Sequence, residues 1–410
     1  MTQTQRQAVI SRVKSVVLKH HFNIGNVDYA EWCREVDQQS ATLTAADDSV
    51  FEEGVRALLA KLRSSHTNFY ASDVNSIRPQ HVIGATLRSV INSDRPHWMF
   101  LDVFEDSPAA RAGAAPGQLL VSVDGTPAIP PAFPVFRFGQ DHQVTTKLPA
   151  QQETRNLVIS IPPRKARKGR PPLIEPKSVS HRMRTQRVGL LRVPFFPGSF
   201  GIRFSKVLKA AVEDLKAKGC DRLIIDLRGC LGGSLGFASL VSYLCADRIP
   251  IGYDVTRKRL QRGYTVAELP SVPMPETKAG LLFCLARFSI QDKSLMLLTQ
   301  GLGRQPFHGH VVMLVNEFTN SAGEMAAQFA KDTKLATLVG EKTMGNVLGS
   351  TTFNVGNGYT LYIPIFGWYS PSGNYTEGSG VEPDVVVDID PEALASGRDA
   401  QLNKALDVLQ

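Results

Sequence analysis

The chain has 410 residues, of which 43% are hydrophobic and 20% charged, and its formal net charge is +8. This composition is typical of a folded globular protein and excludes wholesale disorder. Because single hydrophobic cores stop growing at roughly 250–300 residues, the length predicts two or three domains. The longest apolar runs, at residues 222–227 and 311–315, are only strand-length, so we expect no transmembrane helix.

The cysteines and the first residues bear on the cellular compartment. Residues 1–22 are typical of an amphipathic helix, with polar residues interspersed throughout, and lack the continuous apolar core and cleavage site of a signal peptide, so we expect a cytoplasmic protein. Five cysteines without close pairs indicate reduced thiols rather than disulfides or a zinc cluster. They are Cys33, Cys220, Cys230, Cys245 and Cys284.

Residues 1–75 predict a helical N-terminal domain. Apolar side chains recur there at helical spacing, with Val9, Val13 and Val16 on one stripe and Val55 and Leu58 on another. The domain ends in the motif SSHTNFY, which spans residues 64–70.

Residues 76–163 change to short β-rich runs separated by turn signals. Their order resembles a PDZ domain of the kind associated with proteases. That resemblance implies capture of an extended chain end by strand addition at a sheet edge. A purely structural or regulatory module is the alternative. The resemblance rests on Ser107-Pro108-Ala109, Ala112-Gly113, the strand-like residues 119–123 and Asp124-Gly125.

Residues 164–186 predict a solvated linker. The segment is rich in proline and basic residues, and it contains no aromatic side chain on which a base could stack. It therefore favours a linker over a nucleic-acid site, and we expect no nucleic-acid partner. The alternative, that this segment binds nucleic acid, predicts an affinity that falls steeply as the salt concentration rises.

Residues 187–410 alternate strand-like and helix-like segments up to about residue 390, which predicts an α/β layer with a partly parallel sheet. Helices are expected at residues 204–217, 236–244 and 322–331, and residues 358–373 turn β-rich again. The whole chain therefore predicts a multidomain α/β (α+β) protein.

The strongest local motif is Thr319-Asn320-Ser321-Ala322-Gly323-Glu324, which lies between an apolar strand and a helix rich in alanine. A serine at this junction has its hydroxyl at the strand end, where amides of the helix N-terminus can stabilise a developing anion. The alternative is that Ser321 is a helix N-cap and Glu324 completes a capping box.

A second motif, DLRGCLGG at residues 226–233, runs from a buried strand into a glycine-rich turn. Glycines there allow a backbone amide to approach a reacting carbonyl closely, as one half of an oxyanion hole. An ordinary tight turn before a helix explains the same residues.

These two motifs, the earlier SSHT segment and the later EGSGVEPD segment resemble, in this order and spacing, the carboxyl-terminal processing and tricorn-type serine peptidases. The likeness covers most of the chain, and SAGEMAAQFAKD, ATLVGEKTMG and GVEPD carry it most specifically. It implies a ClpP/crotonase-like α/β catalytic core, with no metal and no organic cofactor.

One residue departs from the processing-protease branch of this family. A lysine acts as general base in that branch, but the aligned position after Met344-Gly345 holds Asn346. A neutral amide cannot take a proton from serine. Lys342 is out of register with the family's lysine and is expected to be solvated.

The tricorn-type branch uses histidine instead, and resemblance to it implies a role for each of four residues. Ser321 is then the nucleophile, His66 the general base, and Glu377 the acid that orients the histidine, with Ser65 as a relay. Amides of Ala322 and of Gly232 or Gly233 would form the oxyanion hole. Two other acids, Glu382 and Asp384, stay open as alternatives to Glu377.

The sequence therefore predicts a serine peptidase that acts on protein or peptide substrates, by internal cutting or by tail trimming. The chain's PDZ-like region would capture substrate ends, and a homo-oligomer is possible. The competing hypothesis is a binding protein that retains the peptidase fold without catalysis, as the interphotoreceptor retinoid-binding protein does within the wider family.

Overall fold

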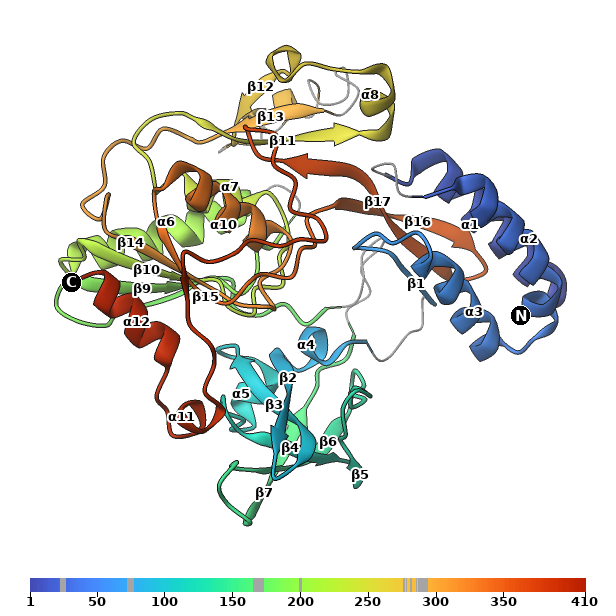
Figure 1. Cartoon of the computed structure of the whole chain (residues 1–410), viewed down its shortest axis with the longest axis horizontal. Coiled ribbons are helices and arrows are strands. Elements are labelled where there is room, and N and C mark those ends of the chain that lie inside the picture. The colour runs from blue at the N-terminus through green and yellow to red at the C-terminus, as the bar shows by residue number, and fades with distance from the viewer. Residues whose placement is uncertain are drawn as a thin grey trace.

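The computed structural model describes residues 1–22, 27–71, 77–164, 173–198, 201–275, 277, 279–280, 282–284, 286 and 294–410. In this part of the chain the helices are α1 (Gln3–His20), α2 (Tyr29–Ala45), α3 (Asp48–Ala60), α4 (Pro79–Val82), α5 (Pro108–Arg111), α6 (Ile202–Ala217), α7 (Gly236–Val241), α8 (Arg257–Arg262), α10 (Ala322–Thr333), α11 (Pro391–Ala395) and α12 (Ala400–Val408). Figure 1 shows how they surround three sheets.

The strands are β1 (Asn68–Ala71), β2 (Ala85–Asn92), β3 (Arg95–Val103), β4 (Leu119–Val123), β5 (Thr126–Pro127), β6 (Asp141–Lys147), β7 (Thr154–Ser160), β8 (Ser180–Met183), β9 (Val188–Arg192), β10 (Arg222–Asp226), β11 (Pro250–Thr256), β12 (Ser271–Pro273), β13 (Leu295–Leu298), β14 (Val311–Val315), β15 (Thr337–Gly340), β16 (Gly349–Gly356), β17 (Tyr359–Tyr369) and β18 (Val385–Val386). This mixture of helices and sheets confirms the expected α/β multidomain class.

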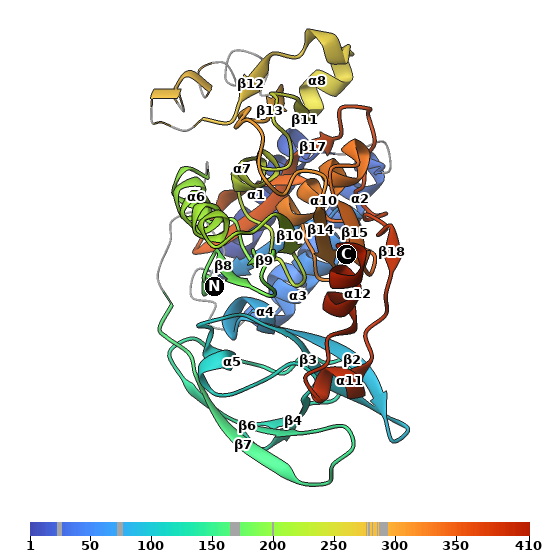
Figure 2. The same ribbon diagram turned by 90° about the vertical axis from the view of Figure 1, so that its left-hand side faces the viewer.

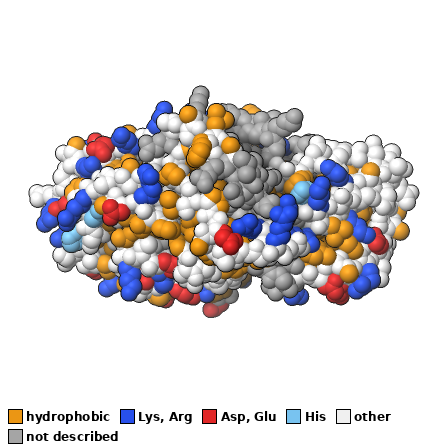
Figure 3. Space-filling model, turned by 90° about the horizontal axis from the view of Figure 1, so that it is seen from above, with side chains coloured by type: hydrophobic (Ala, Val, Ile, Leu, Met, Phe, Trp, Pro, Cys, Tyr) orange, Lys and Arg blue, Asp and Glu red, His pale blue; other side chains and the backbone are white. Residues whose placement is uncertain are grey.

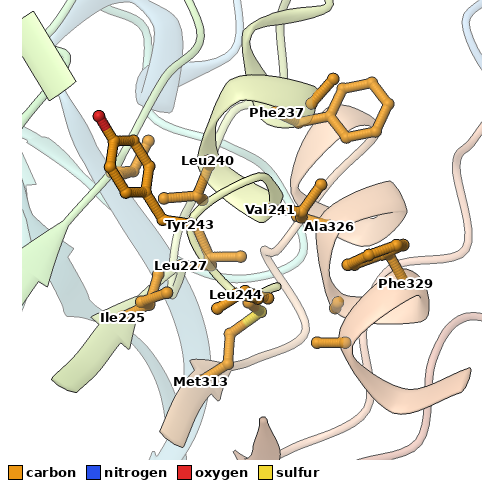
Figure 4. Close-up of a cluster of buried hydrophobic side chains, with 14 of the residues drawn as sticks. Ile225, Leu227, Phe237, Leu240, Val241, Tyr243, Leu244, Met313, Ala326 and Phe329 are labelled. Atoms are coloured by element: carbon orange, nitrogen blue, oxygen red, sulfur yellow. The ribbon is translucent and has the colours of Figure 1, made fainter. Parts of the chain in front are cut away.

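The central sheet has the strand order β18-β15-β14-β10-β9-β8, and only the pairing of β8 with β9 is antiparallel. Alternate side chains of a strand point to opposite faces. Leu223 and Ile225 of β10 therefore join the large core beneath α6, α7 and α10, whereas Ile224 packs with Leu402 of α12. Figure 4 shows side chains of the first of these cores, among them Ile225 of β10, Phe237 of α7 and Phe329 of α10.

A second sheet, ordered β1-β17-β11-β13-β12 with β16 beside β17, connects the N-terminal helices to the rest. Helices α1 to α3 bury their apolar stripes, as predicted, against Leu361 and Ile363 of β17. Strand β1 pairs antiparallel with β17, with Asn68 opposite Tyr362. This pairing holds the SSHT segment, which directly precedes β1, beside the C-terminal half of the chain.

The third sheet, β2-β3-β4-β6-β7 with β5 beside β4, forms a unit that we call the β-module (residues 79–161). Its own apolar core includes Phe100, Phe136 and Ile159. A separate cluster joins Met99 and Leu101 of β3 to Phe318, Ile389 and Leu394 outside the module. Figures 1 and 2 both show the module below the central sheet, with α11 alongside it.

Part of the predicted linker forms regular structure. Residues 165–172, which include much of its positive charge, lie outside the described residues. Strand β8, however, falls within the predicted range of 164–186 and forms an edge of the central sheet. Its sequence, SHRM, is largely exposed and has no alternation of apolar side chains, so no strand pattern marked it.

No helix within the described ranges is long and apolar enough to cross a membrane. Figure 3 looks down on the end of the molecule that carries α8, and there Lys and Arg side chains stand in separate groups among hydrophobic ones. Positive charge on this face is thus divided rather than gathered into one continuous stripe.

Candidate active site

Ser321 lies immediately before α10 in an unusual backbone conformation, with φ 53° and ψ −115°. Non-glycine residues rarely adopt a positive φ, and such conformations persist only where surrounding contacts enforce them. Here the Ser321 amide donates to Glu324 Oε2 at 3.0 Å, and the Met325 amide donates to the Ser321 carbonyl at 3.0 Å. The first turn of α10 therefore holds Ser321 in place.

Glu324 does more than the predicted capping. Its carboxylate is fully buried and accepts hydrogen bonds from Thr343 Oγ1 at 2.7 Å, Gly345 N at 2.6 Å and Asn346 N at 2.8 Å, in addition to Ser321 N. Burial raises the pKa of this carboxyl, while these donors oppose the increase. The Glu324 side chain thus links the Ser321 turn to residues 343–346.

The glycine turn packs directly against Ser321. A Cβ atom at Gly232 would lie 2.6 Å from Ser321 Cβ, and one at Gly233 would lie 2.2 Å from the Phe196 carbonyl oxygen. Both residues also have positive φ, at 78° and 132°. Only glycine satisfies both the space and the backbone conformation at these two positions.

The amides of this turn differ in their partners. Gly229, Cys230 and Leu231 donate to Asn316 Oδ1, the Leu227 carbonyl and the Pro194 carbonyl. The Gly232 amide lies beside the weakly accepting sulfur of Cys230, and the Gly233 amide has no hydrogen-bond acceptor among the described residues. Gly232 and Gly233 are thus the turn amides available to an oxyanion, together with Ala322 at the start of α10.

His66, Ser65 and Glu377 form a hydrogen-bonded relay. Glu377 Oε2 accepts from the Ser65 hydroxyl at 2.9 Å, Glu377 Oε1 accepts from the Ser65 amide at 2.9 Å, and Ser65 Oγ lies 2.8 Å from His66 Nδ1. The hydroxyl has one hydrogen, which it gives to the carboxylate, so Nδ1 must carry the hydrogen of the His66–Ser65 bond. His66 Nε2 is therefore left with the free lone pair that a base needs.

The surroundings of His66 favour its neutral form. Burial lowers the pKa of its imidazole from 6.5 to about 4, although the side chain keeps some exposure to solvent. The ring centroid lies 6.2 Å from that of Tyr362, and His66 itself has a positive φ of 56°. Within the described residues no hydrogen bond joins His66 to Ser321.

The competing acids and the nearby lysine are engaged elsewhere. Lys342 Nζ pairs with Glu382 Oε1 at 2.7 Å, and both side chains are more than half exposed, at 52% and 59%. Asp384 accepts from the Leu338 amide at 2.9 Å and pairs with Lys331. Glu377 is therefore the acid that contacts the histidine segment, and Asn346 contributes its backbone amide to Glu324.

The sequence did not indicate a role for His21, whose side chain contacts Ser64 of the SSHT segment. This fully buried residue places Nε2 2.8 Å from Ser64 Oγ and Nδ1 2.8 Å from Tyr29 Oη. Ser64 Oγ in turn lies 2.9 Å from Thr67 Oγ1. A polar residue at the end of an amphipathic helix carries no local signal of such a contact, because the partner lies 43 residues away.

Residues 187–387 match the model of peptidase family S41. The carboxyl-terminal-processing protease of Synechocystis is 25% identical over 340 residues, which cover 80% of this chain and 68% of that protein. A putative tricorn protease homolog of Streptomyces coelicolor is 25% identical over 92% of this chain, but the match takes in only 30% of its own length.

Two solved structures share the fold. A photosystem II D1 C-terminal processing protease aligns with a TM-score of 0.53 and 18% identity, over 95% of this chain and 94% of that one. A putative S41 protease from Bacteroides fragilis aligns with a TM-score of 0.58 and 15% identity, over 97% and 96% of the two chains. Together with the S41 match, these likenesses support a serine-type peptidase, and a further similar protein, of Staphylococcus haemolyticus, is named as a probable CtpA-like serine protease.

Proposed function

We propose that the chain hydrolyses peptide bonds through an acyl-enzyme on Ser321, with His66 as the general base. The observation that carries this proposal is the Glu377–Ser65–His66 relay, which leaves the lone pair of His66 Nε2 free. A strained serine at a helix N-terminus, beside a glycine turn with available amides, supplies the complementary half of the site.

In the proposed reaction Ser321 Oγ attacks the scissile carbonyl carbon while His66 Nε2 takes the hydroxyl proton. The resulting imidazolium gives that proton to the leaving amine as the C–N bond breaks, which leaves an ester on Ser321. A water molecule then attacks the ester, His66 again takes and returns the proton, and the carboxylic acid product leaves. Glu377, through Ser65, stabilises the imidazolium in both halves.

The negative oxygen of each tetrahedral intermediate would be bound by backbone amides. The Ala322 amide and one amide of the Gly232-Gly233 pair are the donors, and each such donor commonly contributes ~3 kcal/mol to transition-state stabilisation. Because the Gly232 amide lies beside the Cys230 sulfur, the Gly233 amide is the less engaged of the two.

We also propose that substrates are chain ends or loosely folded segments. Two of the similar proteins are named as carboxyl-terminal processing proteases, which supports a tail-directed action. In the β-module, β2 is an outer strand of its sheet, and an outer strand can accept an extended peptide by backbone pairing.

The direct test is cleavage of casein by the wild-type protein beside Ser321→Ala and His66→Ala, with the products measured by intact mass. We expect only the wild type to cut, and the product masses separate internal cutting from tail trimming. Labelling by a fluorophosphonate probe gives a second readout, since Ser321→Ala must lose it. Cleavage that survives in both variants would contradict the proposal.

The second candidate function is non-catalytic peptide binding. It is favoured by the lack of a His66–Ser321 hydrogen bond in the described residues and by Asn346 at the position of the family's lysine. This hypothesis predicts saturable binding of casein fragments by all three proteins, with no cleavage and no labelling of Ser321.

A further inference from the structure

The β-module contributes a buried carboxylate that reaches the proposed active site. Asp102 on β3 is only 5% exposed, and its Oδ2 accepts from Thr86 Oγ1 of the neighbouring strand at 2.7 Å. The same oxygen accepts from Asn316 Nδ2 at 3.1 Å, and Asn316 lies just after β14 in the peptidase core. Asp102 therefore bonds across the boundary between the two units.

Asn316 relays this contact to both loops of the site. Its side chain is fully buried, and its Oδ1 accepts from the Gly229 amide at 3.0 Å and from the Phe318 amide at 3.1 Å. Gly229 begins the glycine turn, and Phe318 belongs to the segment that leads to Ser321. Because Nδ2 donates to a carboxylate, the orientation of the Asn316 amide is determined, and Oδ1 must face the two backbone amides.

The contact between the module and the glycine turn is also close in space. A Cβ atom at Gly229 would lie 2.8 Å from Asp102 Oδ2, and Gly229 has a φ of 70°. Nearby, Arg88 of β2 forms a two-pronged ion pair with Glu341, at 2.8 and 2.6 Å, and also contacts Glu317. The boundary is thus held by directional polar contacts as well as by apolar packing.

We infer that Asp102 is a positioning residue for the oxyanion hole, acting through Asn316, so that the β-module completes the peptidase site rather than only delivering substrate. This inference rests on the proposed function. Asp102 does not touch the reacting atoms; it fixes the separation between the glycine turn and the Ser321 turn. Oxyanion donors act only when they are held in place before the charge develops.

A reciprocal exchange of the two side chains tests the inference. Asn316→Asp alone places two carboxylates in contact, and we expect kcat to fall on the order of 100-fold with little change in KM. Asp102→Asn alone loses the charge that orients Asn316, and we expect a fall of about 10-fold. In the double variant Asp102→Asn/Asn316→Asp, the amide introduced on β3 can donate to the carboxylate introduced after β14, which still accepts from Gly229 and Phe318.

We therefore expect the double variant to recover most of the lost kcat, which a sum of two independent defects cannot do. Arg88→Gln is the comparison, because it breaks other polar contacts across the same boundary and leaves Asn316 intact. A loss of kcat in Arg88→Gln equal to that in Asn316→Asp, or a double variant worse than either single one, would overturn the inference.

Hydrogen exchange separates this inference from the proposed function. Amide exchange of peptides covering residues 227–234, measured by mass spectrometry, reports the order of the glycine turn without needing any catalysis. We expect faster exchange in both single variants and near wild-type exchange in the double variant. An inactive wild type would defeat the proposed function alone, whereas unchanged exchange in the single variants would defeat the inference. Thermal unfolding checks that each variant is folded.

Discussion

The Ser65 hydroxyl donates to Glu377 Oε2 at 2.9 Å although 312 residues separate the two along the chain. The pairing of β1 with β17 accounts for this proximity, because it fixes the histidine segment against the C-terminal half. The proposed catalytic relay therefore exists only when the N-terminal helices are docked.

Removal of the relay hydroxyl should reduce catalysis without unfolding the protein. In Ser65→Ala, His66 loses the partner of its Nδ1 hydrogen and can adopt the wrong tautomer, so we expect kcat to fall roughly 10²- to 10⁴-fold. Glu377→Gln should cause a similar loss. Glu382→Gln is the matched control, since Glu382 pairs with Lys342 on the surface. Steady-state kinetics measure kcat for each variant. Equal losses of kcat in Ser65→Ala, Glu377→Gln and Glu382→Gln would refute the relay.

Two glycines with nearly the same positive φ allow the effect of steric crowding to be distinguished from that of backbone strain. Gly232 and Gly125 have φ of 78° and 77°, but a Cβ at Gly125 has no neighbour within 4 Å. Gly125→Ala should lose about 1–2 kcal/mol of stability from strain alone and retain activity. Gly232→Ala should abolish cleavage, because its Cβ would meet Ser321 Cβ at 2.6 Å. Thermal unfolding and casein cleavage measure the two effects, and an active Gly232→Ala would contradict the proposed site.

Lys342 should be dispensable for the reaction. Its ammonium forms an exposed ion pair with Glu382, and such pairs contribute at most about 1 kcal/mol to stability. Lys342→Gln should therefore leave kcat within about twofold, whereas His66→Ala should reduce it by roughly three or more orders of magnitude. The reverse pattern would indicate a Ser/Lys mechanism, in which Lys342 and not His66 is the general base.

The motifs, together with the family resemblance that they carry, nominated the candidate site residues. Ser321 follows an apolar strand and precedes a helix, and the structure has β14 and α10 there, with α10 starting at Ala322 as expected. Glu377 was expected from the resemblance, with Glu382 and Asp384 open as alternatives; in the structure Glu382 pairs with Lys342, and Asp384 accepts from the Leu338 amide. The ends of strands and helices can be recognised from residue types because the backbone conformation there restricts which residues fit.

Contacts between distant segments could not be predicted in this way. Glu324 was explained by a bond three residues away, but its other partners begin 19 residues further on, at Thr343. Asp102 and Asn316 are 214 residues apart, and neither belongs to a periodic pattern or a turn motif. A buried polar side chain becomes interpretable only when the fold supplies its partner.

Protonation of three histidines should destabilise the folded protein at acidic pH. Burial lowers the pKa of His21, His66 and His81 from 6.5 to about 4 in the folded protein. Between these pH values the unfolded chain binds protons at these histidines that the folded chain does not, so the three histidines lower the free energy of unfolding as the pH falls from 6.5 towards 4. The slope for each histidine cannot exceed about 1.4 kcal/mol per pH unit.

Activity and stability should therefore respond differently as the pH falls below 6.5. Neutral His66 remains available well below pH 6.5, so kcat/KM should hold until its pKa is approached, unless unfolding intervenes first. His21→Gln removes one of the three protons, and it should flatten the decrease in unfolding free energy between pH 6.5 and 4 while lowering stability at about pH 7, where His21 bonds Ser64 and Tyr29. Urea unfolding at several pH values measures both changes. An equal acid dependence in His21→Gln and wild type would show that His21 does not resist protonation in the folded state.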